Sequence, residues 1–201
     1  MKLLLALTQI VIVVLISVPA AAQRLLVDVD LYWKPSASVS DLNLNDVNKK
    51  STLMIEIKDF RTISPLTRIG INLEEPKNFL PVDTETNIAQ FVQTHLSEEL
   101  SRAGLQIKNL QPDFILTGEL KEFFVKETDS YQGIVTIHYI LKSKNKTFWQ
   151  KEITASNAKS GRSYKLDNYA ETLSDTVMDS LQKLLSDPEF KKAFQTKKEK
   201  S

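Results

Sequence analysis

Residues 114–158 read FILTGELKEFFVKETDSYQGIVTIHYILKSKNKTFWQKEITASNA, and this stretch decides the fold. It contains three runs of alternating apolar and polar residues, 114–126, 131–142 and 147–158, and such alternation is typical of half-buried strands. Short polar turns around Asp129 and Lys144 separate the runs. Because short turns join antiparallel strands, the stretch predicts an antiparallel meander.

An amphipathic helix pattern lies on each side of the meander. Apolar residues at helical spacing mark the first helix: Ile88, Phe91, Val92, Leu96, Leu100 and Ala103. Gly104 follows them at the position where a left-handed residue ends a helix. The second helix carries the same spacing at Ala170, Leu173, Val177, Leu181 and Leu184.

One more strand pattern precedes the first helix, with Leu53, Ile55 and Ile57 alternating with polar or flexible residues. The order is therefore one strand, a helix, three strands and a helix. The simplest packing that buries one face of each element is an α+β two-layer sandwich. We expect a mostly antiparallel sheet of about four strands, with the two amphipathic helices on one face.

The first 22 residues predict an export signal. Lys2 precedes an apolar run from Leu3 to Val18, and small residues lead to Ala22. This order is typical of a secretory signal peptide, so we expect cleavage after Ala22, a periplasmic location and no transmembrane span in the mature protein. The alternative is an uncleaved anchor, because the run approaches the length that crosses a bilayer of about 30 Å.

The remainder of the chain is expected to form one domain with two appendages. Residues 23–50 begin with a strand-like alternation, Val27, Val29, Leu31 and Trp33, and continue as a polar linker. Residues 51–195 form the single α+β domain, and residues 196–201 form a basic, solvated tail.

Composition excludes several classes of function. The chain has 26 Lys plus Arg against 25 Asp plus Glu, so it lacks the basic surface of a general nucleic-acid-binding protein. It has no cysteine, which excludes disulfides and thiolate chemistry. The two histidines, His95 and His138, have no second ligand at metal-binding spacing. We therefore expect no catalytic residues, no metal and no cofactor, and a protein that is not an enzyme.

Several short motifs resemble the YajG-like family of bacterial envelope lipoproteins over roughly residues 51–186. These are MIEIKDFR at 54–61, RIG at 68–70, LSRAGL at 100–105, PDFILTGEL at 112–120 and FWQK at 148–151. The resemblance implies a Gram-negative periplasm, attachment to envelope machinery and no known catalytic residues. Those relatives carry a lipid on an N-terminal cysteine, whereas this chain has Gln23 there.

Residues 61–82 contain glycine and several prolines without a sustained period, which predicts a long loop of the kind that often carries function. The candidate interaction surface there comprises Asp59, Arg61, Arg68, Gly70 and Asn72. Asp59 and Arg61 share one face at a strand end. They either hold the loop by hydrogen bonds to its backbone or to Arg68, or they bind an anionic head group or a partner's carboxylate.

Two functions follow from these expectations. The first is a non-enzymatic binding or assembly factor that engages a protein partner or complex of the envelope through the 61–82 loop, the sheet edge or the open sheet face. The alternative is a carrier of a lipid or other amphiphile held between helices and sheet. The aromatic residues that favour a carrier are Phe123, Phe124, Phe148 and Trp149.

Overall fold

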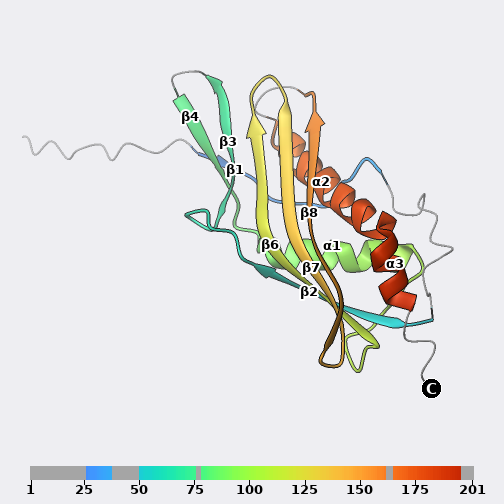
Figure 1. Cartoon of the computed structure of the whole chain (residues 1–201). Helices are drawn as coiled ribbons and strands as arrows, with labels where there is room; N and C mark the ends of the chain where they lie inside the picture. The colour runs from blue at the N-terminus through green and yellow to red at the C-terminus, as the bar shows by residue number, and fades with distance from the viewer. Residues whose placement is uncertain (1–25, 38–49, 76–77, 162–164, 196–201) are drawn as a thin grey trace, which may run out of the picture.

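The computed structural model of the chain describes residues 26–37, 50–75, 78–161 and 165–195. The leader, residues 38–49 of the polar linker and the basic tail lie outside these ranges. Figure 1 shows a sheet with helices packed on one of its faces. The strands of the sheet are β1 (Val27–Asp28), β2 (Thr52–Asp59), β3 (Arg68–Glu75), β4 (Asn78–Asp83), β5 (Gln106–Ile107), β6 (Phe114–Glu127), β7 (Tyr131–Ser143) and β8 (Lys146–Lys159).

The meander is confirmed, and its strands are the longest of the sheet. β6, β7 and β8 pair antiparallel in chain order, with Val135 of β7 opposite both Phe123 and Ala155. Buried and more exposed residues alternate along β6, as a strand with only one covered face requires. One register shift, between Leu120 and Glu122, interrupts the β6–β7 ladder and marks a bulge at Lys121.

The sheet forks at β6. One edge of β6 pairs with β7, while the other edge carries two strands in succession, both parallel to it. β2 lies along the first half, from Leu53 opposite Phe114 to Asp59 opposite Leu120. β3 lies along the end, from Gly70 opposite Val125 to Asn72 opposite Glu127. β5 then extends the β2 branch, and β4 and β1 extend the β3 branch; we call β1, β3 and β4 the wing.

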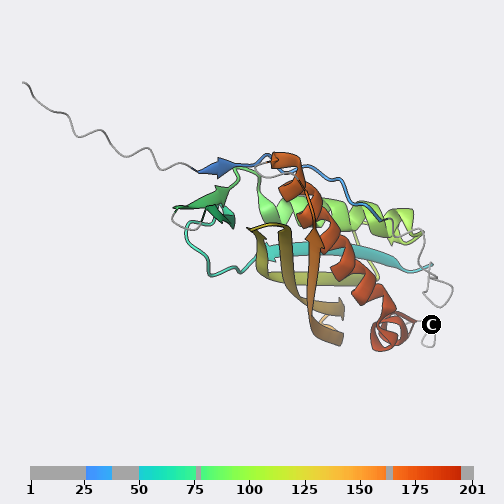
Figure 2. The ribbon, with the colours of Figure 1, turned by 90° about the horizontal axis from the view of Figure 1, so that it is seen from above.

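The expected α+β class is confirmed, but the expected sheet is wrong in number and direction of strands. Within the described residues the sheet has eight strands, and four of the seven pairings are parallel. It also curls across the helices, so it is not a flat layer of a two-layer sandwich (Figure 2). Residues 61–82 are not one loop, because the loop ends at Thr67 and β3 and β4 follow it. Gly70 and Pro81 hide these strands by breaking the alternation.

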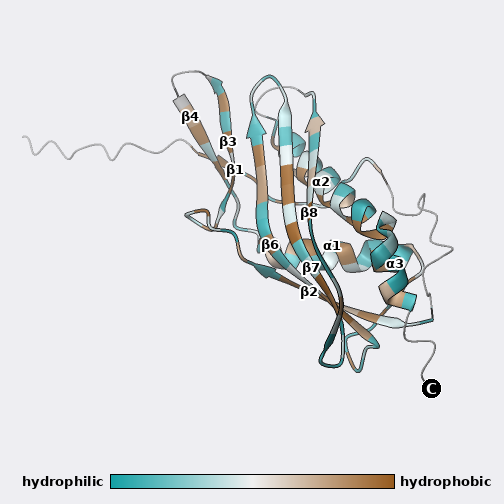
Figure 3. Cartoon of the chain, viewed as in Figure 1, coloured by the Kyte–Doolittle hydropathy of each residue, from teal (hydrophilic) through white to brown (hydrophobic). Residues whose placement is uncertain are grey.

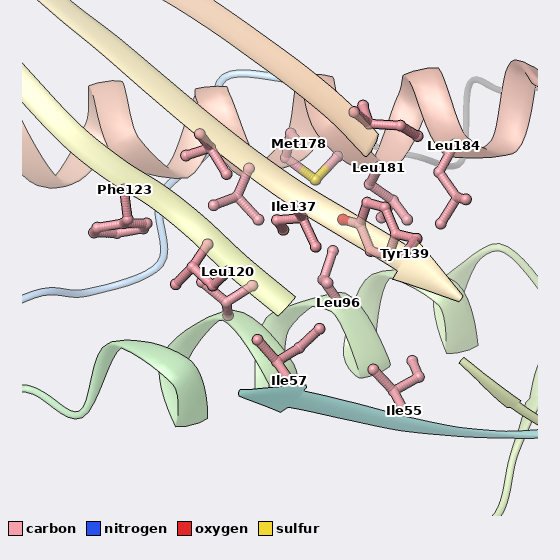
Figure 4. Packing of buried hydrophobic residues seen from close by; sticks show 14 of the residues in the cluster. Ile55, Ile57, Leu96, Leu120, Phe123, Ile137, Tyr139, Met178, Leu181 and Leu184 are labelled. Atoms are coloured by element: carbon pink, nitrogen blue, oxygen red, sulfur yellow. The ribbon is translucent and has the colours of Figure 1, made fainter. Parts of the chain in front are cut away.

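The helices are α1 (Ile88–Arg102), α2 (Leu166–Ser186) and α3 (Pro188–Gln195). Asn87 caps α1 by accepting a hydrogen bond from the Gln90 amide, and Gly104 ends that helix with φ of 90°. Figure 4 shows the core between the layers, where Ile57 of β2, Leu96 of α1 and Leu181 of α2 point toward the meander. These three side chains are at most 6% exposed, so the core is closed around both long helices.

The segment before the linker also belongs to the packed structure. Val27 and Val29 are buried, and Trp33 stacks on His95 of α1 with ring centroids 4.5 Å apart. The indole Nε1 of Trp33 donates to Glu99 at 3.1 Å, and the backbone amide of Lys34 donates to the Ser174 hydroxyl of α2 at 3.2 Å. Residues 29–36 therefore form a strap that contacts both long helices. Figure 2 shows this strap running along α1.

Candidate functional site

Asp59 and Arg61 lie between the end of β2 and the start of β3, the two strands that share one edge of β6. Arg61 lies two residues beyond the end of β2, and its side chain is only 3% exposed. Its guanidinium binds the Asp59 carboxylate and also donates to two backbone carbonyls, that of Leu66 at 2.6 Å and that of Arg68 at 2.9 Å. Arg61 therefore fastens the end of β2 to the start of β3 through the intervening loop.

This contact shifts the acid–base equilibrium of the carboxyl group. Burial by itself raises the pKa of Asp59, but the side-chain and backbone hydrogen bonds from Arg61 outweigh burial, so the pKa is lowered. The Asp59 carboxyl group is consequently ionised at neutral pH, and both of its oxygens accept hydrogen bonds from Arg61. Such an arrangement is suited to holding backbone in place.

Arg68 and Gly70 lie in the wing. Arg68 pairs with Asp83 of β4, which stands opposite it in the antiparallel register. Gly70 is where β3 meets β6, and a Cβ at this position would lie 2.3 Å from the carbonyl oxygen of Val125. Only glycine allows this backbone approach.

Asn72 belongs to a buried polar cluster at the far end of β6. Its amide nitrogen donates to the Glu127 carboxylate and lies 3.2 Å from the Tyr169 hydroxyl, and the hydroxyl also donates to Glu127. Burial and then the hydrogen bond with Glu127 raise the pKa of Tyr169 above its ordinary value. The same two causes raise the pKa of the neighbouring Tyr131 to about 12. The cluster ties the wing to α2.

The five predicted surface residues thus divide between the fork, the wing and the buried cluster. Arg61, Gly70 and Asn72 are buried, so they do not form one exposed surface with Asp59 and Arg68. Three of the four aromatic residues that suggested a lipid cavity pack on other rings. Phe123 contacts Phe91, and Trp149 contacts Phe190, with centroids 6.3 and 5.2 Å apart.

The loop at residues 60–67 instead covers a pocket on the sheet face that is turned away from the helices. This loop groove has a volume of about 350 Å³, within the usual range for binding pockets. Thr62 and Ile63 line it from the loop; the sheet contributes Lys121, Glu122 and Phe124 of β6, Thr136 of β7 and Glu152 of β8. Three strands and one loop therefore meet in a single concave site.

The loop groove joins an apolar floor to a polar rim. Ile63 and Phe124 supply apolar surface, and two carboxylates, Glu122 and Glu152, stand on β6 and β8, the two strands that flank β7. The Thr136 hydroxyl donates to Glu122 at 3.3 Å and shares a 3.0 Å hydrogen bond with Thr154. Lys121, which also lines the groove, is paired with Glu119 at 2.7 Å, and its ammonium lies 4.8 Å from the ring centre of the half-exposed Phe60.

Sequence reasoning pointed to this loop but missed the sheet side of the groove. Glu122, Thr136 and Glu152 are far apart in the chain and share no motif. The available signal was the run Glu119-Leu120-Lys121-Glu122, in which the alternation of β6 slips by one residue. No group of three or more metal-ligating side chains occurs within the described ranges. The chemistry of the groove suits an apolar side chain next to a cation or a hydrogen-bond donor.

Comparison with known proteins identifies a family whose sequence profile this chain matches. The sequence profile of a family described as uncharacterized lipoprotein matches residues 38–195. A search of curated protein sequences gives no match. None of the helices in the described part of the chain is long and apolar enough to cross a membrane.

The chain is similar to several solved structures at low sequence identity. The crystal structure of protein XCC0632 from Xanthomonas campestris has a TM-score of 0.58 and 9% identity, covering 86% of this chain and 98% of that one. The hypothetical protein CT253 from Chlamydia trachomatis has a TM-score of 0.48 and 10% identity, with coverage of 73% and 99%. Lipoprotein GNA1162 from Neisseria meningitidis has a TM-score of 0.37 and 9% identity, with coverage of 58% and 90%.

Proposed function

The chain belongs to the bacterial lipoprotein-like family described as uncharacterized lipoprotein, and from this membership we propose that it acts in the cell envelope as a non-enzymatic binding or assembly protein. The finer parts of the proposal are a periplasmic location, cleavage after Ala22 and a relationship to YajG-like proteins. The order of charge, apolar run and small residues in the leader supports export. The short motifs at 54–61 and 112–120 support the YajG relationship.

The loop groove is the observation that carries the binding function. It is concave and open, and loop residues that are well exposed flank it, among them Phe60 and Leu66. Large apolar side chains held in solvent beside a shaped pocket are typical of protein-binding sites. The loop is fixed by Arg61, so the groove is formed before a partner arrives and binding requires little ordering.

The groove lining defines the partner's chemistry. An apolar side chain fits against Ile63 and Phe124, and a lysine or arginine beside it reaches Glu122 and Glu152. We therefore propose a partner segment of an envelope protein in which an apolar residue stands next to a basic one. Glu152→Lys places a cation against that basic residue and weakens the complex, whereas Glu152→Gln keeps the shape and weakens it less.

A photocrosslinking experiment tests this function. A benzoylphenylalanine residue replaces Thr62 in the groove, and in a matched variant it replaces Leu110, which is 78% exposed at the opposite end of β2. We expect an envelope-protein adduct from position 62 that is absent from position 110 and is reduced by Glu152→Lys. Identical adducts from both positions, or none from position 62, would contradict the proposal.

A further inference from the structure

The wing is apolar on the face that packs against the core, and it is apolar also on the face that is turned away from the core. Val27 and Val82 are paired in register and buried, so their neighbours Leu26 and Pro81 point to the other side. Phe79 lies two residues from Pro81 on β4, and Ile71 of β3 stands opposite Pro81. These four residues, Leu26, Ile71, Phe79 and Pro81, form the outer wing face.

This face is exposed to solvent. Phe79 is 65% exposed and Leu26 is 49% exposed, while Ile71 and Pro81 are partly exposed. Figure 3 shows hydrophobic colouring over much of β4, although this strand is at the margin of the molecule. A strand that is apolar on both faces normally has both faces covered, so the outer wing face lacks its cover in the isolated chain.

The charged neighbours of the outer wing face leave little net charge. Asp83 lies on the same face two residues after Pro81, and its ion pair with Arg68 neutralises it. Asp28 of β1 is exposed and stands opposite Asp83, so it adds a carboxylate, and Lys126 of β6, exposed beside Ile71, adds a cation. An apolar patch whose border charges balance is suited to the surface of a bilayer.

The position of the leader in the sequence also favours a lipid bilayer as the cover of the outer wing face. Only residues 19–25 separate Leu26 from the apolar run Leu3–Val18. Figures 1 and 2 both place the wing, which contains β1 and so lies at the start of the described chain, opposite α3. As long as the leader is attached, the part of the sequence that is most compatible with lipid therefore joins the folded domain directly beside the outer wing face.

We propose that the outer wing face rests on the bilayer surface, with Phe79 and Leu26 inserted among the lipid headgroups. The contact is independent of the loop groove, because no residue of the outer wing face lines that pocket. It also does not require the leader, since the four side chains belong to the folded domain.

Depth-dependent fluorescence quenching tests the proposal in the full chain. Since the protein has no cysteine, Phe79→Cys provides a single site for an NBD label, and Leu110→Cys provides a control at the far end of β2 that is even more exposed, 78% against 65%. The probe vesicles contain equal parts of phosphatidylethanolamine and phosphatidylglycerol, with a doxyl lipid labelled just below the headgroup. We expect a blue shift and several-fold stronger quenching at position 79 than at position 110.

Three results would overturn the proposal. Equal quenching at both positions in protein that floats with vesicles would show that the leader alone binds lipid. Absence of quenching at position 79 would show that the face does not touch the bilayer. A blue shift at position 79 that rises with protein concentration, before vesicles are added, would identify a second copy as the cover. The crosslinks from position 62 are read separately, so failure here leaves the groove proposal standing.

Discussion

The guanidinium of Arg61 binds the carboxylate of Asp59, two residues earlier, with Nε 2.9 Å from one oxygen and Nη2 2.8 Å from the other. The same guanidinium holds two carbonyls of the loop that leads to β3. One buried side chain therefore sets the separation of the two strands that share an edge of β6.

Replacement of Arg61 is expected to be strongly destabilising. Arg61→Ala leaves the Asp59 carboxylate and two carbonyls without their donor, and because Asp59 is partly exposed we expect a loss of about 2–3 kcal/mol, below that of a fully buried pair. Urea unfolding measures the change, with exposed Lys58→Ala on the same strand as the control within about 0.5 kcal/mol of wild type. A loss below about 1 kcal/mol for Arg61→Ala would show that the loop is held by other contacts.

Asp59 is expected to contribute to acid sensitivity. Its folded-state pKa is lowered, so the stability it contributes is present above its unfolded pKa of about 3.9 and is lost as pH falls from there through the folded pKa. The difference in free energy of unfolding between wild type and Asp59→Asn should therefore shrink below about pH 4. A difference that stays constant through this range for Asp59→Asn would refute the pKa shift.

The strap is expected to stabilise the domain through Trp33. Trp33→Ala removes the stack on His95 and the hydrogen bond to Glu99, and because the side chain is only partly buried we expect a loss of about 2 kcal/mol. Trp33→Phe retains the ring and should lose less. Thermal unfolding compares these variants with Asp30→Ala, which changes an exposed residue of the same segment. Equal melting temperatures for Trp33→Ala and Asp30→Ala would mean that Trp33 contributes no stability.

Two buried tyrosines offer a matched test of the Glu127 cluster. Tyr169→Phe removes a donor from a buried carboxylate, which costs about 1.5–3 kcal/mol, whereas Tyr139→Phe removes a neutral bond to Ser180 that is worth about 1 kcal/mol. Both hydroxyls are inaccessible, so the variants compare a carboxyl acceptor with a hydroxyl acceptor. Chemical denaturation should rank Tyr169→Phe as the less stable variant, and the opposite order would show that the bond from Tyr169 to Glu127 contributes less than the bond between Tyr139 and Ser180.

The sequence predicted those parts of the fold that depend on local periodicity. The three meander strands, both amphipathic helices and the helix end at Gly104 agree with the structure to within one to two residues at most termini. The expectation of four antiparallel strands failed because β1 and β5 have only two residues each, and β3 and β4 contain Gly70 and Pro81. Such strands exist through pairing with distant segments, which a local pattern does not contain.

The site was predictable only on its loop side. Asp59, Arg61 and Arg68 attracted attention as charges at a strand end, and they lie at the fork. The groove itself depends on the register of β6 against β7 and β8, which brings Glu122, Thr136 and Glu152 together. Neither the fork nor this register has a signature in a single sequence, so the pocket emerges only from the tertiary structure.

The fork also has a geometric consequence. Phe124 lines the loop groove, and the next residue of β6, Val125, stands opposite Gly70 of the wing. The two proposed contact surfaces, the loop groove and the outer wing face, therefore meet β6 at consecutive residues. The close backbone contact of Gly70 with Val125 leaves no space for one surface to shift relative to the other. A partner seated in the groove would be carried at a fixed height above the lipid, which would make β6 a molecular spacer.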